Sequence, residues 1–190
     1  NDGAQSFTER IVTTLADDGS SASVADVDGD GDVDGLVATY GQDMVAWFEN
    51  DGAQSFTERV VTTLMDGAYG VYPTDADGDG DVDLLAIAHA GAKVAWYKND
   101  GSGTFEEIDV DDRDKPRAPA AADVDGDGDA DFLVAFATLD DVVWYENDCA
   151  TSAPTPAPRP TAPTPAPTAT SEPTTAAPTP RPTTFCTSVA

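Results

Sequence analysis

Basic side chains are scarce in this chain of 190 residues, which has nine lysines and arginines and one histidine against 36 acidic residues. The formal net charge of −27 leaves no basic surface that could replace the counterions of a nucleic acid, so we expect no nucleic-acid partner. The same charge opposes binding to anionic membranes, and no apolar run reaches the roughly 18 residues of a spanning helix. We therefore expect no membrane insertion.

Motifs of the common enzyme classes are missing as well. The sequence contains no G-x-S-x-G, no H-E-x-x-H, no phosphate-binding loop and no glycine-rich dinucleotide motif. The one histidine, His89, has no paired base in a recognisable motif, which argues against nucleophilic catalysis. We expect a protein that is not an enzyme.

Cysteine is represented by Cys149 and Cys186 alone, and neither belongs to a C-x-x-C motif, so a zinc or redox centre is not expected. A disulfide within the chain and a disulfide between two subunits are both compatible with this spacing. Either bond fits an oxidising compartment. The chain begins at Asn1 without a signal-like stretch, which is expected of a mature product or a fragment.

Internal repetition dominates the first 148 residues. The segment NDGAQSFTER at residues 1–10 recurs unchanged at 50–59, and a diverged copy begins at Asn99. Each unit also holds an Asp-rich run, which is DVDGDGDVD at 26–34, DADGDGDVD at 75–83 and DVDGDGDAD at 123–131. Each unit closes with an aromatic segment, which is VAWFEN at 45–50, VAWYKN at 94–99 and VVWYEN at 142–147. A repeat of this length is typical of a propeller blade of four short strands.

Strand signals account for most of each unit. Residues 7–14 alternate polar with β-branched or aromatic side chains, and short apolar stretches at 23–27, 36–40 and 44–48 follow. Several of these stretches are apolar on both faces, as in sheets that pack against neighbouring sheets. No segment has a sustained helical period. The sequence predicts an all-β fold.

The Asp-rich loops, the Trp-aromatic segments and the NDG turns together resemble the FG-GAP/VCBS repeat of integrin-α-like β-propellers and of many secreted surface proteins. The resemblance covers residues 1–148 and implies three four-stranded blades, with the Asp loop between the first and second strands of each blade. The repeats run over 1–49, 50–98 and 99–147. Closed propellers typically have four to eight blades, so three repeats predict an incomplete propeller.

The Asp-rich loops, with the pattern D-x-D-x-D-G-x-x-D, predict calcium sites. Ca²⁺ binds six to eight oxygen ligands, and five carboxylates within nine residues supply such ligands. Soft or imidazole-preferring metals are disfavoured because no loop contains Cys or His. We expect about three Ca²⁺ ions, one per repeat. The predicted ligands are Asp26, Asp28, Asp30, Asp32, Asp34, Asp75, Asp77, Asp79, Asp81, Asp83, Asp123, Asp125, Asp127, Asp129 and Asp131.

These loops do not fit an EF-hand, although the first half of the pattern is the same. An EF-hand needs a glutamate at the twelfth loop position and flanking helices, whereas Val37, Ala86 and Val134 stand there. The family resemblance instead implies that the ninth residue closes the site, which is Asp34, Asp83 or Asp131. The alternative is a set of solvated turns, but so many carboxylates without a cation repel one another strongly.

Tryptophan recurs at one position of the repeat, as Trp47, Trp96 and Trp144. We expect these side chains to pack between blades rather than to form a ligand platform.

Residues 149–190 form a tail rich in Pro, Thr and Ala, with Cys149 and Cys186 at its two ends. Eleven of the 14 prolines lie there, which predicts an extended polyproline II conformation instead of a packed core. The tail resembles mucin-like stalks and hydroxyproline-rich glycoproteins, and an unmodified flexible linker is the alternative. The predicted acceptors of O-linked glycans are Thr155, Thr161, Thr164, Thr168, Thr174 and Thr179.

The two ends of the repeat region are predicted to be complementary. By analogy with the family, residues 7–14 form the outer strand of a blade that the chain lacks, whereas the last unit lacks its own outer strand because the Pro-rich tail follows. Unpaired edges favour strand addition. We therefore predict a secreted, calcium-binding structural protein, a subunit of an extracellular glycosylated fibril that assembles head to tail. The alternative is a fragment of an integrin-like adhesion protein or of a carbohydrate-binding propeller, secreted or at the cell surface.

Overall fold

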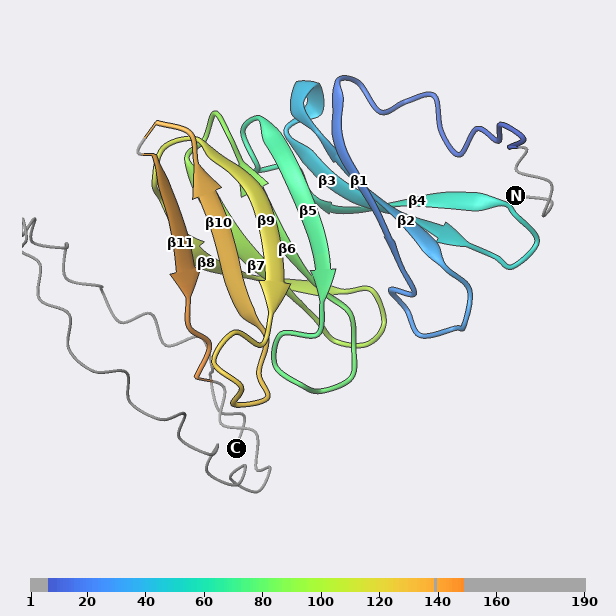
Figure 1. The fold of residues 1–190 in the computed structure, drawn as a ribbon. Helices are drawn as coiled ribbons and strands as arrows, with labels where there is room; N and C mark the ends of the chain where they lie inside the picture. The colour runs from blue at the N-terminus through green and yellow to red at the C-terminus, as the bar shows by residue number, and fades with distance from the viewer. Residues whose placement is uncertain (1–6, 139, 149–190) are drawn as a thin grey trace, which may run out of the picture.

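The computed structural model describes residues 7–138 and 140–148, which fold into three sheets that lie side by side (Figure 1). The first sheet contains β1 (Gly19–Ala25), β2 (Asp34–Thr39), β3 (Met44–Asn50) and β4 (Phe56–Thr62). The second contains β5 (Ala68–Thr74), β6 (Asp83–Ala88), β7 (Lys93–Asn99) and β8 (Phe105–Asp111). The third contains β9 (Pro116–Ala122), β10 (Asp131–Phe136) and β11 (Asp141–Tyr145). A short 3-10 helix, η1 (Tyr40–Gln42), follows β2.

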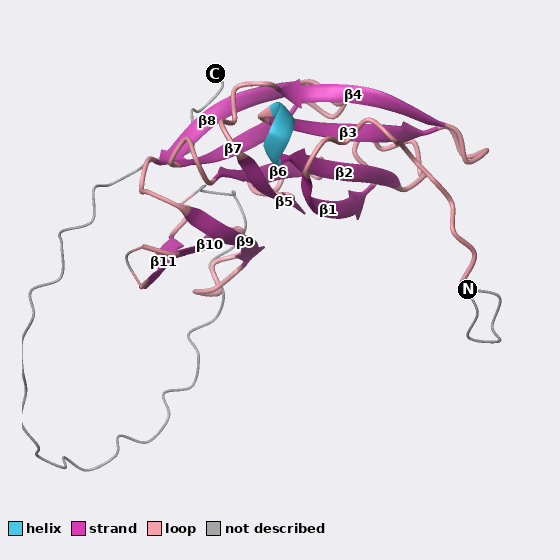
Figure 2. Cartoon of the chain, turned by 90° about the horizontal axis from the view of Figure 1, so that it is seen from above, coloured by secondary structure: helices cyan, strands magenta, loops and turns pink. Residues whose placement is uncertain are grey.

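Every sheet is an antiparallel meander in which strands that follow one another in the sequence are neighbours. The all-β prediction is confirmed for the described residues, and the three sheets form an open array rather than a closed ring. Viewed from above, the second sheet lies between the first and the third (Figure 2). The array is thus a stack with two free ends.

Each sheet is shifted relative to the sequence repeat. The Asp loop joins the first two strands of each sheet, as the resemblance implied, and in the first two sheets the outer strand comes from the following repeat. Strand β4, for example, starts at Phe56 inside the second repeat and pairs with β3 of the first. Consecutive repeats are therefore joined by shared sheets as well as by packing.

The prediction of four strands in every blade is wrong for the third sheet, which has three strands in the part of the chain described, whereas the prediction that the last unit lacks its outer strand is confirmed there. After Tyr145 no segment of the FTER type follows, because the Pro-rich sequence begins a few residues later. Proline lacks the N–H that a strand would donate to β11.

The prediction of a strand at residues 7–14 is also wrong within a single chain. These residues form no strand, and the side chains of Phe7 and Ile11 are 85% and 70% exposed. The physical reason is the lack of a partner, because a strand needs a neighbouring edge for its backbone hydrogen bonds and the described part of the chain has no sheet before β1.

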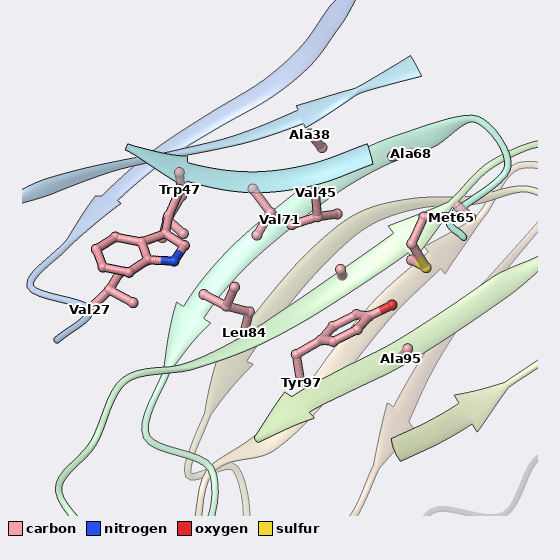
Figure 3. Packing of buried hydrophobic residues seen from close by; sticks show 13 residues of the cluster. Val27, Ala38, Val45, Trp47, Met65, Ala68, Val71, Leu84, Ala95 and Tyr97 are labelled. Atoms are coloured by element: carbon pink, nitrogen blue, oxygen red, sulfur yellow. The ribbon is translucent and has the colours of Figure 1, made fainter. Parts of the chain in front are cut away.

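Apolar side chains fill the spaces between the sheets. One cluster lies between the first and second sheets and includes Trp47, Leu84 and Tyr97 (Figure 3). A second cluster lies between the second and third sheets and includes Trp96 and Phe132. All six residues of β6 are buried because this strand faces a neighbouring sheet on each side, as its apolar sequence predicts.

The expected packing of the repeated tryptophans is confirmed at two of the three positions. Trp47 and Trp96 are 3% and 1% exposed, each between two sheets. Trp144 differs, with 43% exposure, because it lies on the face of the third sheet where no further sheet follows in the described residues.

Candidate metal centres

The three Asp loops lie at the same edge of the array, at the lower end of the sheets in Figure 1. We call residues 26–34, 75–83 and 123–131 the first, second and third Asp loop. The sequence folds into a tight loop because Gly29 and Gly31 take positive φ angles of 73° and 95°, which other residues adopt only with strain. The loop turns its carboxylates toward a common centre.

Three carboxylates of each loop come together. One oxygen from each member of a group lies within 4.8 Å of the corresponding oxygens of the other two. The three groups are Asp26, Asp28 and Asp34; Asp75, Asp77 and Asp83; and Asp123, Asp125 and Asp127. Hard anionic oxygens at such separations are the donor set that Ca²⁺ prefers. Acidic clusters thus occur once per loop, and each could hold a metal ion.

Two buried oxygens support the fit to a cation. Oδ1 of Asp26 and Oδ1 of Asp77 are shielded from solvent and have no hydrogen-bond partner among the described residues. A buried carboxylate oxygen without a partner is costly, and a bound cation would remove that cost. The residues present therefore fit Ca²⁺ in the first two loops.

The other predicted ligands lie outside these groups. Several of them stabilise the turn instead, because Oδ1 of Asp30 accepts a 2.8 Å hydrogen bond from the N–H of Asp32 and Oδ1 of Asp79 accepts one of 3.0 Å from Asp81. In the third loop Asp129 and Asp131 are the predicted ligands outside the group, and the N–H of Asp129 donates to Oδ1 of Asp127, a member of the group, at 3.0 Å. Their role as calcium ligands remains a prediction.

The ninth aspartate of each loop has a structural role that the sequence did not reveal. Asp34, Asp83 and Asp131 are at most 1% exposed. Each accepts two backbone N–H groups, one from the second residue of its own loop at 2.9–3.1 Å and one from the asparagine that ends or follows the third strand at 2.7–2.8 Å. The carboxylate thus joins the loop to the third strand of its sheet.

Burial changes the acidity of these groups. Desolvation raises the pKa of Asp83 to about 6, and the N–H groups of Asn99 and Ala76 offset the effect only in part. Desolvation raises the pKa of Asp34 too, against the opposing hydrogen bonds from Asn50 and Val27. A neighbouring cation would favour the ionised form of both carboxylates.

The repeated asparagine that ends the aromatic segment, which is Asn50, Asn99 or Asn147, is a second feature that sequence reasoning missed. The side-chain amide of Asn99 donates to the carbonyl of Val27 in the first Asp loop, and that of Asn147 donates to the carbonyl of Ala76 in the second. Each bond connects one sheet to the loop of the preceding sheet. The recurrence of Asn-Asp at the end of each aromatic segment was the available signal, although it gave no indication of the partner.

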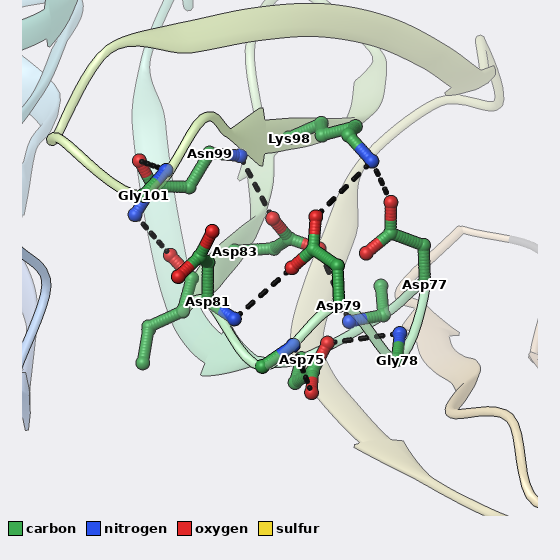
Figure 4. A network of polar contacts seen from close by, with 12 residues as sticks. Asp75, Asp77, Gly78, Asp79, Asp81, Asp83, Lys98, Asn99 and Gly101 are labelled. Carbon is green, nitrogen blue, oxygen red and sulfur yellow. Dashed lines mark hydrogen bonds and ion pairs between the residues drawn. The ribbon is translucent and has the colours of Figure 1, made fainter. Parts of the chain in front are cut away.

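The second loop contains a cation of the protein itself. The ammonium group of Lys98, near the end of β7, forms ion pairs with Asp77 and Asp79, the latter at 3.4 Å (Figure 4). The side chain of Asp77 is 12% exposed, so this pair is partly shielded from solvent.

Some predicted sites lie outside the described residues. These are Cys149, Cys186 and the six candidate glycosylation threonines of the tail. In the residues that the structure describes, no helix has the length and apolar character needed to cross a membrane.

Comparison with known proteins gave one family. A family model described as FG-GAP-like repeat matches residues 26–86 and 75–134, so that the matches together span more than half of the chain. Both matches begin at the first aspartate of an Asp loop and end in the second strand of the next sheet. A search of curated proteins found no match. The matched repeats fit a propeller-like protein of the extracellular or adhesion type, and this chain belongs to the FG-GAP-like repeat family.

Proposed function

We propose that this protein is a secreted, non-enzymatic, calcium-binding structural subunit whose copies join head to tail by exchange of a strand. The Asp loops would hold Ca²⁺, and the tail would carry O-linked glycans on the surface of a fibril. The observation that carries the proposal is the match between an unpaired segment at one end of the array and a paired strand inside it.

The N-terminal segment has the sequence of a strand that the same chain already uses. Residues 7–13 read FTERIVT, and β4 reads FTERVVT, so the two differ only at Ile11 and Val60. Strand β4 pairs with β3, whereas residues 7–13 form no strand and are largely exposed. At the other end of the array, the outer edge of β11 is open in the described residues. A sequence able to pair and an edge able to receive it are thus both present.

The pairing of β4 with β3 and of β8 with β7 indicates the register that the added strand would take. Strand β4 places Arg59 opposite Trp47 and Phe56 opposite Asn50, and β8 repeats this register with Ile108 opposite Trp96. Residues 7–13 of one copy would accordingly add to β11 of another. The register places Arg10 opposite Trp144, Phe7 opposite Asn147 and Thr8 opposite Glu146.

Charge complementarity favours this register. In the first sheet Arg59 on β4 forms an ion pair of 2.7 Å with Glu49 on β3. The equivalent residues at the proposed joint are Arg10 and Glu146, which retain the two charges. The added strand would therefore bring a cation next to a glutamate that lies among other carboxylates.

An exposed apolar face beside β11 supports a second copy as the partner. Leu133, Val142 and Trp144 are 37%, 69% and 43% exposed, whereas Leu85 and Trp96 at equivalent positions of the second sheet are at most 1% exposed. A strand alone would cover the edge of the third sheet. The first sheet of the incoming copy, which follows that strand in sequence, would cover its face as β5–β8 cover the first sheet.

A longer adhesion-type protein is the second candidate. In that case residues 7–13 would complete a preceding blade of the same polypeptide instead of a blade of another copy. The family match favours this candidate because FG-GAP-like repeats are typical of adhesion proteins with propeller domains. The two candidates differ in whether the 190-residue chain forms assemblies on its own.

The test compares two variants of the N-terminal segment. The double variant I11P/V12P removes two consecutive N–H groups, one of which must point toward β11 because alternate residues of a strand face opposite sides. The matched control is I11V, which installs the residue that β4 has. Sedimentation velocity and negative-stain microscopy are recorded with calcium and after addition of EGTA.

The proposal predicts concentration-dependent particles or fibres for the wild type and for I11V, and monomers for I11P/V12P. At protein concentrations low enough for all three to be monomeric, circular dichroism should be the same, because residues 7–14 form no strand in the monomer. Assemblies should shorten on chelation. Monomeric wild-type protein at all concentrations would reject the assembly and leave the adhesion-protein candidate.

A further inference from the structure

The three Asp loops differ in the charge that the end of the third strand brings to them. An aromatic residue, a charged residue and an asparagine follow one another at the end of the third strand of each sheet, and in the third sheet the last two lie just beyond the strand. The charged residue is Glu49 in the first unit, Lys98 in the second and Glu146 in the third. This position of the repeat therefore holds an anion in the first and third units and a cation in the second.

Lys98 lies inside the ligand set of its loop. Its ammonium group forms ion pairs with Asp77 and Asp79, and Asp77 is one of the three carboxylates whose oxygens converge (Figure 4). The Lys98 side chain is 35% exposed, so the ion pairs are partly shielded from water. A positive charge of the protein itself thus already lies against two carboxylates of this loop.

Among the described residues, no lysine or arginine forms an ion pair with a carboxylate of the converging groups in the first and third loops. In the first unit the cation Arg59 on β4 forms its ion pair with Glu49, at 2.7 Å, and not with an aspartate of the loop. In the third unit Glu146 lies among other carboxylates. Repulsion chiefly from Asp148, and also from Asp125 and Asp131, raises its pKa. A cation that bound the third loop would relieve this repulsion.

We propose that Lys98 is a built-in counterion that makes the second Asp loop the weakest calcium site of the three. The inference rests on the proposed calcium binding and adds its distribution along the chain. Ca²⁺ entering the second loop must displace the ammonium group from Asp77, or bind with its positive charge close by. Both alternatives lower the affinity, by repulsion or by the loss of charge-assisted hydrogen bonds.

This distribution has a consequence for assembly. The second Asp loop would keep its conformation at low calcium, because the ammonium group of Lys98 offsets part of the negative charge of its carboxylates. Calcium would mainly stabilise the first and third sheets. These are the two sheets that the proposed strand exchange brings together. Calcium would then control the joints between copies more than the stability of the middle of each copy.

The experiment is a calcium titration of chelator-treated full-length protein by isothermal titration calorimetry. Four single variants are compared with the wild type. K98Q removes the ammonium group, and K93Q removes a cation at the other end of β7, where Lys93 pairs with Asp109 at 2.9 Å. D26N and D75N each remove the first carboxylate of one loop and so assign the binding steps.

The wild type should show two tight steps and one step weaker by about tenfold or more, the ratio expected for a nearby unit charge that is only partly screened. D75N should abolish the weak step and D26N a tight one. K98Q should bring the weak step close to the other two, whereas K93Q should leave all three as in the wild type. Circular dichroism of each variant checks the fold.

Three results would count against the inference. Three equal steps in the wild type would overturn it while leaving calcium binding intact. The same would follow if D75N removed a tight step, or if K98Q left the weak step unchanged. A titration without any binding heat at several temperatures, together with a melting temperature that calcium does not change, would reject the proposed calcium binding itself and the inference with it.

Discussion

The side-chain amide of Asn99 donates a 2.8 Å hydrogen bond to the backbone carbonyl of Val27, which lies 72 residues earlier in the sequence. The donor ends the third strand of the second sheet, and the acceptor belongs to the first Asp loop. Asn147 makes the equivalent hydrogen bond to the carbonyl of Ala76 at 2.6 Å, so the same bond connects the first sheet to the second and the second to the third. This contact connects the first and the second Asp loop to the sheet that follows each of them.

The first prediction concerns this bond. Replacing Asn99 by alanine leaves the buried carbonyl of Val27 without its donor, which should reduce the free energy of unfolding by about 1–3 kcal/mol more than the same replacement at Asn50. Asn50 is the matched control, because its amide donates to Val33 within its own sheet. Urea unfolding in the presence of EGTA measures both variants. Equal losses would show that the bond between the sheets contributes nothing.

The second prediction separates the structural role of Asp34 from the proposed calcium binding of the first loop. D34A leaves the N–H groups of Val27 and Asn50 without their acceptor and should cost about 2–5 kcal/mol even in EGTA. Asp28 belongs to the same group and accepts a long hydrogen bond of 3.3 Å from the N–H of Asp30, so D28A should cost less in EGTA and should mainly reduce the stabilisation by calcium. Thermal unfolding with and without calcium measures both effects. A D34A protein that calcium restores to wild-type stability would contradict the structural role.

The third prediction concerns pH. Because the pKa of Asp83 is about 6 in the folded state and near 3.8 in the unfolded chain, the folded protein binds more protons between these values. Its free energy of unfolding should therefore fall as the pH rises from about 4 to about 6, so that chelated protein melts at a higher temperature at pH 5 than at pH 7.5.

Calcium should reverse this trend, because it binds the ionised carboxylate and competes with the proton. The increase in melting temperature on adding calcium should be larger at pH 7.5 than at pH 5. D83N serves as the control, since it removes the titrating group and should reduce the pH dependence of the chelated protein. A chelated wild type that melts at a lower temperature at pH 5 than at pH 7.5 would contradict the prediction.

The fourth prediction concerns the contact between Gly103 and Trp47. A Cβ atom on Gly103 would lie 2.6 Å from the indole ring of Trp47, and the residue has a φ angle of 77°. G103A should therefore cost about 1 kcal/mol for the backbone conformation and about 1–3 kcal/mol for displacing the ring. Gly29 has a φ angle of 73° and open space around it, so G29A should show the backbone cost alone. Chemical unfolding in EGTA compares the two, and equal losses would contradict the packing argument.

Short-range patterns in the sequence sufficed for the fold class and for the place of the candidate sites. The spacing of aspartates within nine residues predicted a cluster of carboxylates, and three such clusters are present in the structure. The apolar sequence of β6 predicted a strand buried on both faces, and all six of its residues are buried. These features depend on neighbours in the sequence, so the repeat and its periodicity contain enough information to predict them.

Contacts between distant residues decided the rest. Residues 7–13 and β4 are nearly identical in sequence, yet only β4 is a strand, because only β4 has an adjacent edge to pair with. The same asymmetry leaves Trp144 exposed while Trp96 is buried. The sequence by itself determined the repeated unit and its carboxylate loops. The tertiary structure alone decided which edges are paired, which aspartates accept backbone N–H groups and where Lys98 lies, because each of these depends on a partner brought close by folding.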